Sequence, residues 1–164
     1  MSDPNAPKRN RPLRIALVSL AVLVVAGLGT WLWLEVLKDR LIPKRWGEVV
    51  EGRLYRCGRL HPSLVDRMIE KHDVGLVIDL TEDEPGDPSQ DAEKEAVQRL
   101  GIERLHLPLD PMTSRGADDA EEYARAIAAI VEANRESRAA MIHCEAGVQR
   151  TGVAVAFYRI LIQG

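Results

Sequence analysis

Cys144 and Arg150 enclose a short segment whose composition suits the binding of an oxyanion. Residues 139–142 before it are apolar and predict a buried strand, and residues 153–162 after it predict a helix. A tight loop between a strand and a helix directs backbone N–H groups at one point, where the helix N-terminus adds partial positive charge. Arg150 adds a planar guanidinium that can hold two phosphate oxygens at once. These residues therefore predict a phosphate-binding loop.

The position of Cys144 at the start of this loop predicts covalent chemistry. A thiol in such a positive field has a lowered pKa and reacts as a thiolate. Gly147 permits a backbone turn that a side chain would obstruct. A thiolate beside a bound phosphate is a nucleophile directed at phosphorus. The alternative is a buried structural cysteine with a chance arginine nearby, which does not account for the strand, loop and helix together.

The stretch from His143 to Gly152 resembles the signature of the cysteine-dependent protein tyrosine phosphatase superfamily, His-Cys-x-x-Gly-x-x-Arg-Ser/Thr-Gly, at every fixed position. The run Tyr55-Arg56-Cys57-Gly58 and the order of elements resemble small bacterial dual-specificity-like phosphatases. The resemblance covers about residues 46–164. It implies hydrolysis of phosphomonoesters, phosphotyrosine and/or phosphoserine/threonine on protein, through a phosphocysteine intermediate, without a cofactor or a metal ion.

The resemblance also implies the roles of the loop residues. Cys144 would be the nucleophile, Arg150 would bind the phosphate, and the Thr151 hydroxyl would assist departure of the thiolate. His143 would order the loop rather than carry protons. The phosphate would be bound by the segment whose members are Glu145, Ala146, Gly147, Val148, Gln149 and Arg150.

The resemblance also implies a general acid, an Asp on a loop upstream of the cysteine, and Asp110, Asp118 and Asp119 are the candidates. Asp110 directly follows a predicted strand at 102–107, so we expect it at the carboxyl edge of the sheet. Asp118 and Asp119 read as N-terminal residues of a helix, where carboxylates favour the dipole. Asp110 is therefore the preferred acid. Asp79, at another strand end, is expected to be structural.

The substrate class follows from the charge inside the loop. Relatives that act on inositol phosphates tend to carry lysines there, whereas this loop has none and contains Glu145, which would repel a polyanion. A singly phosphorylated protein substrate is therefore expected.

Two other functions remain open. One is a pseudophosphatase that binds phosphopeptides, and the other is a sulfur-transfer or arsenate-reducing enzyme. The intact Cys144, Arg150 and Thr151 favour the phosphatase. Cys57 is interpreted as a small strand-end residue, with a regulatory disulfide to Cys144 as the alternative. The remaining histidines have no metal-ligand spacing: His61, His72 and His106.

The N-terminal part of the chain predicts a membrane anchor. Residues 1–14 form a basic, proline-containing tail, and residues 15–34 carry no charge and end near two tryptophans. Twenty apolar residues span about 30 Å, the thickness of the hydrocarbon layer. We expect a single transmembrane helix at 15–37 in contact with membrane lipid, a basic linker at 38–45 and a phosphatase domain at 46–164. A cleaved signal peptide is the alternative.

Flanking charges leave the orientation of this anchor balanced. A catalytic thiolate favours the reducing cytoplasm for the phosphatase domain, which is the expected side, whereas the short N-terminal tail favours the opposite arrangement. The net charge of −3 gives no reason to expect a nucleic-acid partner. From residue 46 the pattern predicts an α/β fold with a mostly parallel central sheet flanked by helices on both faces. The predicted elements are a hairpin at 48–57, a helix at 64–71 capped by Ser63, a strand at 74–80, and helices at 90–100 and 118–136. Family domains usually continue past the helix at 153–162, so we expect a fragment or a short domain.

Overall fold

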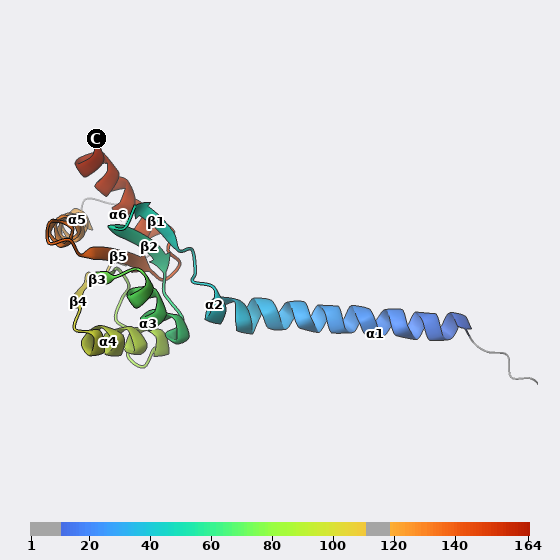
Figure 1. Cartoon of the computed structure of the whole chain (residues 1–164). Coiled ribbons are helices and arrows are strands. Elements are labelled where there is room, and N and C mark those ends of the chain that lie inside the picture. Colours follow the sequence, from blue (N-terminus) through green and yellow to red (C-terminus); the bar gives the residue numbers. More distant parts are fainter. Residues whose placement is uncertain (1–10, 111–118) are drawn as a thin grey trace, which may run out of the picture. The chain divides into compact units, whose positions relative to one another are not determined.

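The computed structural model describes residues 11–110 and 119–164 and divides the chain into two compact units, Met1–Lys38 and Asp39–Gly164. In the first unit, helix α1 (Arg11–Leu32) continues into a π-helical segment η1 (Trp33–Leu37) (Figure 1). The stretch Arg14–Leu32 is long and apolar enough to cross a membrane, and none of it is buried. A signal sequence near an N-terminus would have the same character. Helix α2 (Lys38–Leu41) leads into the second unit.

A five-stranded sheet with the order β1-β2-β5-β3-β4 forms the centre of the second unit. Strand β1 (Gly47–Val50) pairs antiparallel with β2 (Leu54–Gly58), as the hairpin predicted. The other pairs are parallel, and they bring β5 (Ala139–Cys144) between β2 and β3 (Val74–Asp79), with β4 (Glu103–His106) at the edge. Every residue of β5 is buried, as expected for a central parallel strand.

Helices cover both faces of the sheet, which confirms the predicted α/β class (Figure 1). One face packs against α3 (Pro62–Lys71) and α4 (Pro88–Leu100), and the other against α5 (Ala120–Arg135) and α6 (Gln149–Tyr158). Alternate residues of β5 point into the two layers, so that Met141 lies in the first core and Ile142 in the second. The sheet therefore separates two hydrophobic cores, one beneath each pair of helices.

Two helix starts differ from the sequence prediction. Ser63 does not cap α3. His61 does, because its Nδ1 accepts the Ser63 N–H at 3.2 Å and Pro62 occupies the first helical turn, where its missing N–H costs nothing. The last helix begins at Gln149 rather than at residue 153, which places Arg150 and Thr151 in its first turn. Helix α4 does end at Gly101, in the left-handed conformation at φ 67°.

Candidate active site

The Cys144 loop lies at the edge of the sheet where the parallel strands end. Cys144 is the last residue of β5, and α6 begins at Gln149. Strand β2 ends beside it, with Gly58 in register with Cys144, and β3 ends with Asp79 beside His143. Ligand sites in open α/β sheets lie at this carboxyl edge. The topology therefore places the loop where a ligand site is expected.

The carbonyl groups of this loop are bound from outside by three arginines. The Glu145 carbonyl accepts a hydrogen bond from the backbone N–H of Arg59 at 3.2 Å. The Ala146 carbonyl accepts from Arg45 Nη1 at 2.8 Å, and the Gly147 carbonyl accepts from Arg56 Nη2 at 2.6 Å. In a trans peptide the carbonyl and the N–H point in opposite directions. Binding the carbonyls from outside therefore turns the N–H groups toward the inside of the loop.

These inward N–H groups stabilise the thiolate of Cys144. Burial alone raises the pKa of Cys144, but hydrogen bonds from the Thr151 hydroxyl and from the amides of Thr151, Gly147 and Val148 outweigh it. The pKa of Cys144 is therefore lower than that of an ordinary thiol. The Thr151 hydroxyl is buried and has no other partner among the described residues, which leaves it available to the sulfur.

Arg150 is held across the same edge of the sheet. Its side chain is buried, and Nη1 donates to the Leu80 carbonyl at 3.0 Å and to the Leu109 carbonyl at 2.9 Å. These carbonyls belong to the segments that follow β3 and β4. One end of the guanidinium is thus fixed by backbone, which leaves its other N–H groups to bind an oxyanion.

Gly147 lets the loop approach the end of β2. It has φ 67°, and a Cβ built on it would lie 2.5 Å from both the Cys57 carbonyl oxygen and the Gly58 nitrogen. The left-handed conformation is strained for other residues, and a contact this short with backbone atoms excludes a side chain. The glycine predicted from the sequence is therefore required by two independent features.

His143 points away from Cys144, into a buried group of charges. Its Nε2 lies 2.8 Å from Glu93 Oε2 and 3.8 Å from Asp79 Oδ1. Arg104 contacts the same two carboxylates, with Nε 2.9 Å from Glu93 and Nη2 2.5 Å from Asp79. Asp79 also accepts from Thr81 N–H at 2.8 Å, which supports its expected structural role.

The charge states of the side chains in this group follow from their ion pairs. Burial lowers the pKa of His143, but Glu93 and Asp79 together raise it to about 9. Burial raises the pKa of Glu93, but His143 and Arg104 lower it to about 2. Ligand atoms of Asp79, Glu93 and His143 lie within 4.8 Å of one another, close enough to hold a metal ion. Arg104 also engages both carboxylates, so the four side chains form a buried ion network.

Of the three candidate acids, Asp110 lies nearest in the chain to a backbone group that contacts Arg150. It is exposed and follows Leu109, whose carbonyl accepts from Arg150. Asp119 is at the N-terminus of α5, where its side chain makes no capping hydrogen bond. Asp118 lies outside the described residues.

Arg59 and Arg45 were missed by reasoning from sequence. The Arg59 side chain is 8% exposed, and its Nε lies 2.9 Å from Glu145. It also contacts Glu84 at 3.0 Å and Asp87 at 3.2 Å, in the segment before α4. Arg59 is shared by three carboxylates, so the cluster around Glu145 keeps a net negative charge, consistent with the expected repulsion of polyanions. The only sequence signal was the position of Arg59 directly after the Tyr-Arg-x-Gly run.

Cys57 lies on the opposite face of the sheet from Cys144. It is in register with His143 and packs in the core of α3 and α4, whereas Cys144 packs in the core of α5 and α6. Both thiols are free, and burial raises the pKa of Cys57 well above its ordinary value. This arrangement favours the interpretation of Cys57 as a structural residue over a disulfide partner.

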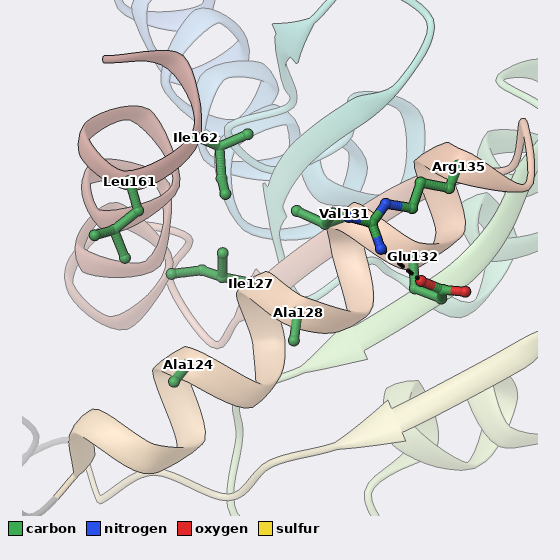
Figure 2. A pocket seen from close by; sticks show the side chains of 8 residues that line it. All are labelled: Ala124, Ile127, Ala128, Val131, Glu132, Arg135, Leu161 and Ile162. Carbon is green, nitrogen blue, oxygen red and sulfur yellow. Dashed lines mark hydrogen bonds and ion pairs between the residues drawn. The ribbon is translucent and has the colours of Figure 1, made fainter.

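An apolar pocket of about 420 Å³ lies between α5 and the π-helical segment η3 (Arg159–Gln163) (Figure 2). Ile127 and Val131 of α5 line it opposite Leu161 and Ile162. Its lining includes no residue of the Cys144 loop, so it is separate from the candidate site.

Comparisons with known proteins agree with this geometry. A family described as a polymorphic toxin system DSP-PTPase phosphatase matches residues 63–163. The crystal structure of P. aeruginosa TpbA is 25% identical, with a TM-score of 0.54 over 70% of this chain and 62% of that chain. The chain thus spans less than two thirds of that TpbA chain. A second TpbA structure, of a Cys-to-Ser variant in complex with phosphotyrosine, is 22% identical, with a TM-score of 0.55 over 76% of this chain and 73% of that chain.

Two further structures share the fold. Tk-PTP in its active form is 23% identical, with a TM-score of 0.58 over 70% of this chain and 71% of that chain. Human DUSP28 is 19% identical, with a TM-score of 0.56 over 75% of this chain and 74% of that chain. No curated protein sequence is significantly similar to the chain.

Proposed function

The chain belongs to the DSP-PTPase phosphatase family of polymorphic toxin systems, and on that premise we propose that it hydrolyses phosphomonoesters through a covalent intermediate on Cys144. One observation carries this proposal: a sulfur with a lowered pKa lies in a loop whose amides point inward, beside a fixed Arg150. That combination binds a phosphate and presents a nucleophile to it.

In the first step, the Cys144 thiolate attacks phosphorus and forms the S–P bond while the P–O bond to the leaving group breaks. The loop amides and Arg150 stabilise the charge on the equatorial oxygens. Asp110, the preferred acid, donates its proton to the departing oxygen. The exposure of Asp110 and its position after Leu109 support this role.

In the second step, water attacks the phosphocysteine and gives a proton to Asp110, which the first step left as a carboxylate. The S–P bond breaks, inorganic phosphate forms, and the thiolate of Cys144 returns. A hydrogen bond from the Thr151 hydroxyl stabilises the sulfur as it leaves. His143 takes no proton in this scheme, because it points into the opposite face of the sheet and is held by Glu93.

The substrate we propose is a singly phosphorylated protein side chain, phosphotyrosine and/or phosphoserine/threonine. The loop contributes no lysine of its own, so it lacks the extra charges that a polyphosphate would require. The complex of the related TpbA variant with phosphotyrosine supports the phosphotyrosine alternative. We further propose that residues 15–37 anchor the chain in a membrane by a single span, with the catalytic unit in the cytoplasm. The apolar stretch Arg14–Leu32 supports the span.

The test is hydrolysis of p-nitrophenyl phosphate by the full chain in detergent, with and without Cys144→Ser. The variant should lose turnover because serine lacks a low-pKa nucleophile, and it should still bind phosphate because the loop keeps its shape. Cys57→Ala is the matched control and should retain turnover, since Cys57 lies on the other face of the sheet. A Cys144→Ser variant as active as the wild type would refute the mechanism. Phosphopeptide binding by a wild-type chain without turnover would support a pseudophosphatase instead.

A further inference from the structure

The linker of residues 42–46, between α2 and β1, reaches the Cys144 loop. Arg45 Nη1 donates to the Ala146 carbonyl at 2.8 Å. The neighbouring Lys44 accepts the Gly58 N–H on its carbonyl at 2.7 Å, and its Nζ lies 3.8 Å from Glu145. We infer that Arg45 is a positioning residue for the catalytic loop, an inference that rests on the function proposed for Cys144.

The bond from Arg45 acts on one particular amide. The Ala146 carbonyl and the Gly147 N–H belong to the same planar peptide unit and point in opposite directions. Fixing that carbonyl from outside therefore fixes the Gly147 N–H, which donates to the sulfur of Cys144. Arg56 fixes the next peptide unit in the same way through the Gly147 carbonyl. The two arginines thus aim consecutive amides at the sulfur.

The backbone conformation of Arg45 indicates that its contact with the Ala146 carbonyl is a specific feature of the fold. Arg45 has φ 50°, a left-handed conformation that residues other than glycine rarely adopt. Such a conformation persists where the surroundings fix it. Here the contacts of Lys44 with Gly58 and of Arg45 with Ala146 hold the turn on both sides. A side chain kept at this position despite backbone strain indicates a function for that side chain.

Loss of the Arg45 side chain should leave the peptide between Ala146 and Gly147 less well oriented. The Gly147 amide would then stabilise both the thiolate and the bound phosphate less well. We expect a fall in kcat/KM of about tenfold to a hundredfold, as for other losses of a charge-assisted contact or of alignment. The pH at which Cys144 is half ionised should rise together with that fall.

The experiment uses the full chain in detergent and four substitutions. Arg45→Ala removes the donor, and Arg45→Gly removes the donor while also relieving the backbone strain. Arg45→Lys restores one donor, which is all that a single carbonyl requires. Arg40→Ala is the matched control, because it removes a nearby positive charge from an exposed side chain. Each variant is assayed for turnover of p-nitrophenyl phosphate, for the pH dependence of Cys144 alkylation by iodoacetamide, for protection by inorganic phosphate, and for Tm.

The other titratable or charged groups that interact with Cys144 are unchanged in every variant. Among the described residues they include Tyr123 of α5, His143 of β5 and Cys57 of β2. A shift of the alkylation profile in Arg45→Ala and Arg45→Gly would therefore come from the loss of the Arg45 side chain.

The expected result separates positioning from stability. Arg45→Gly should unfold at the wild-type Tm or above and still show the loss of turnover and the raised pKa of Cys144 in the alkylation assay. Arg45→Lys should regain most of the wild-type turnover and most of the wild-type pKa. Wild-type turnover and alkylation in both Arg45→Ala and Arg45→Gly would overturn the inference. So would a loss confined to variants with a lowered Tm, or an equal loss in Arg40→Ala. If the wild type itself has no turnover, the proposed function fails, and the alkylation profile still decides the role of Arg45.

Discussion

Replacing Gly147 by alanine tests whether the close approach of the loop to β2 fixes the candidate site. A left-handed conformation costs a residue other than glycine about 1–2 kcal/mol. The new Cβ would also lie 2.5 Å from two backbone atoms, the Cys57 oxygen and the Gly58 nitrogen, neither of which can move as a side chain can. Overpacking of this kind costs about 1–3 kcal/mol more. The sum is about 2–5 kcal/mol of unfolding free energy.

Gly101→Ala is the matched control for this substitution. Gly101 has the same φ of 67°, but a Cβ there would meet nothing within 4 Å. It should therefore cost only the backbone term of about 1–2 kcal/mol and leave turnover unchanged. The difference in unfolding free energy between the two variants therefore measures the cost of the contact between the new Cβ and β2.

Thermal unfolding and turnover of p-nitrophenyl phosphate together decide the matter. At roughly 3–5 °C per kcal/mol for a unit of this size, Gly147→Ala should lower Tm by about 6–25 °C, and Gly101→Ala by about 3–10 °C. Any Gly147→Ala protein that stays folded should turn over poorly, since the displaced loop no longer aims its amides at Cys144. Equal Tm values for the two variants, with normal turnover in Gly147→Ala, would refute the reasoning.

Three other predictions concern the acid, the ion network and the anchor. Asp110→Asn should slow hydrolysis of a phosphotyrosine peptide by about 10²–10⁴-fold, slow an activated aryl ester far less, and flatten the basic limb of the pH profile. Asp119→Asn should change neither the rates nor the pH profile in this way. If Asp119→Asn shows these effects and Asp110→Asn does not, Asp119 is the general acid instead. Glu93→Gln should cost about 3–5 kcal/mol by leaving His143 buried without its partner. The Glu93 contribution is present above its ordinary pKa of 4.5 and is lost as pH falls toward 2. The His143 contribution is present below 6.5 and is lost as pH rises through 9, so the difference in unfolding free energy from the wild type should be largest between 4.5 and 6.5. Denaturant unfolding across pH checks this, and a difference independent of pH would contradict it. Finally, the full chain should sediment with membranes and a chain lacking residues 1–37 should not; a soluble full chain would rule out the anchor.

Much of the site was predictable from sequence because its parts are close together in the chain. The loop from Cys144 to Arg150 is one continuous segment, and the conformation of a short loop between a strand and a helix depends largely on its own residues. The same holds for the hairpin around Gly52 and for the stop of α4 at Gly101, which depend on local backbone preferences. The prediction that Ser63 caps α3 was wrong because its neighbours His61 and Pro62 provide a better cap for the same helix.

The supports of the loop could not be predicted, because they join residues far apart in the chain. Arg45 and Ala146 are separated by 101 positions, and Arg56 and Gly147 by 91. Nothing in the local sequence distinguishes Arg45 from Arg40, and both side chains are exposed. Only the pairing of β2 with β5 brings the start of the folded unit to the loop.

The sequence by itself determined which chemistry could be proposed, since the proposed nucleophile, the proposed phosphate-binding arginine and the glycine of the turn all lie within one short stretch. The tertiary structure decided how that chemistry is held in place. It turned His143 into the opposite face, where the carboxylates of Glu93 and Asp79 hold it charged. It also directed arginines from the linker and from β2 onto the outer carbonyls of the loop. Side-chain direction along a strand is local, but the partner that a side chain meets depends on which strands and helices the fold sets beside it.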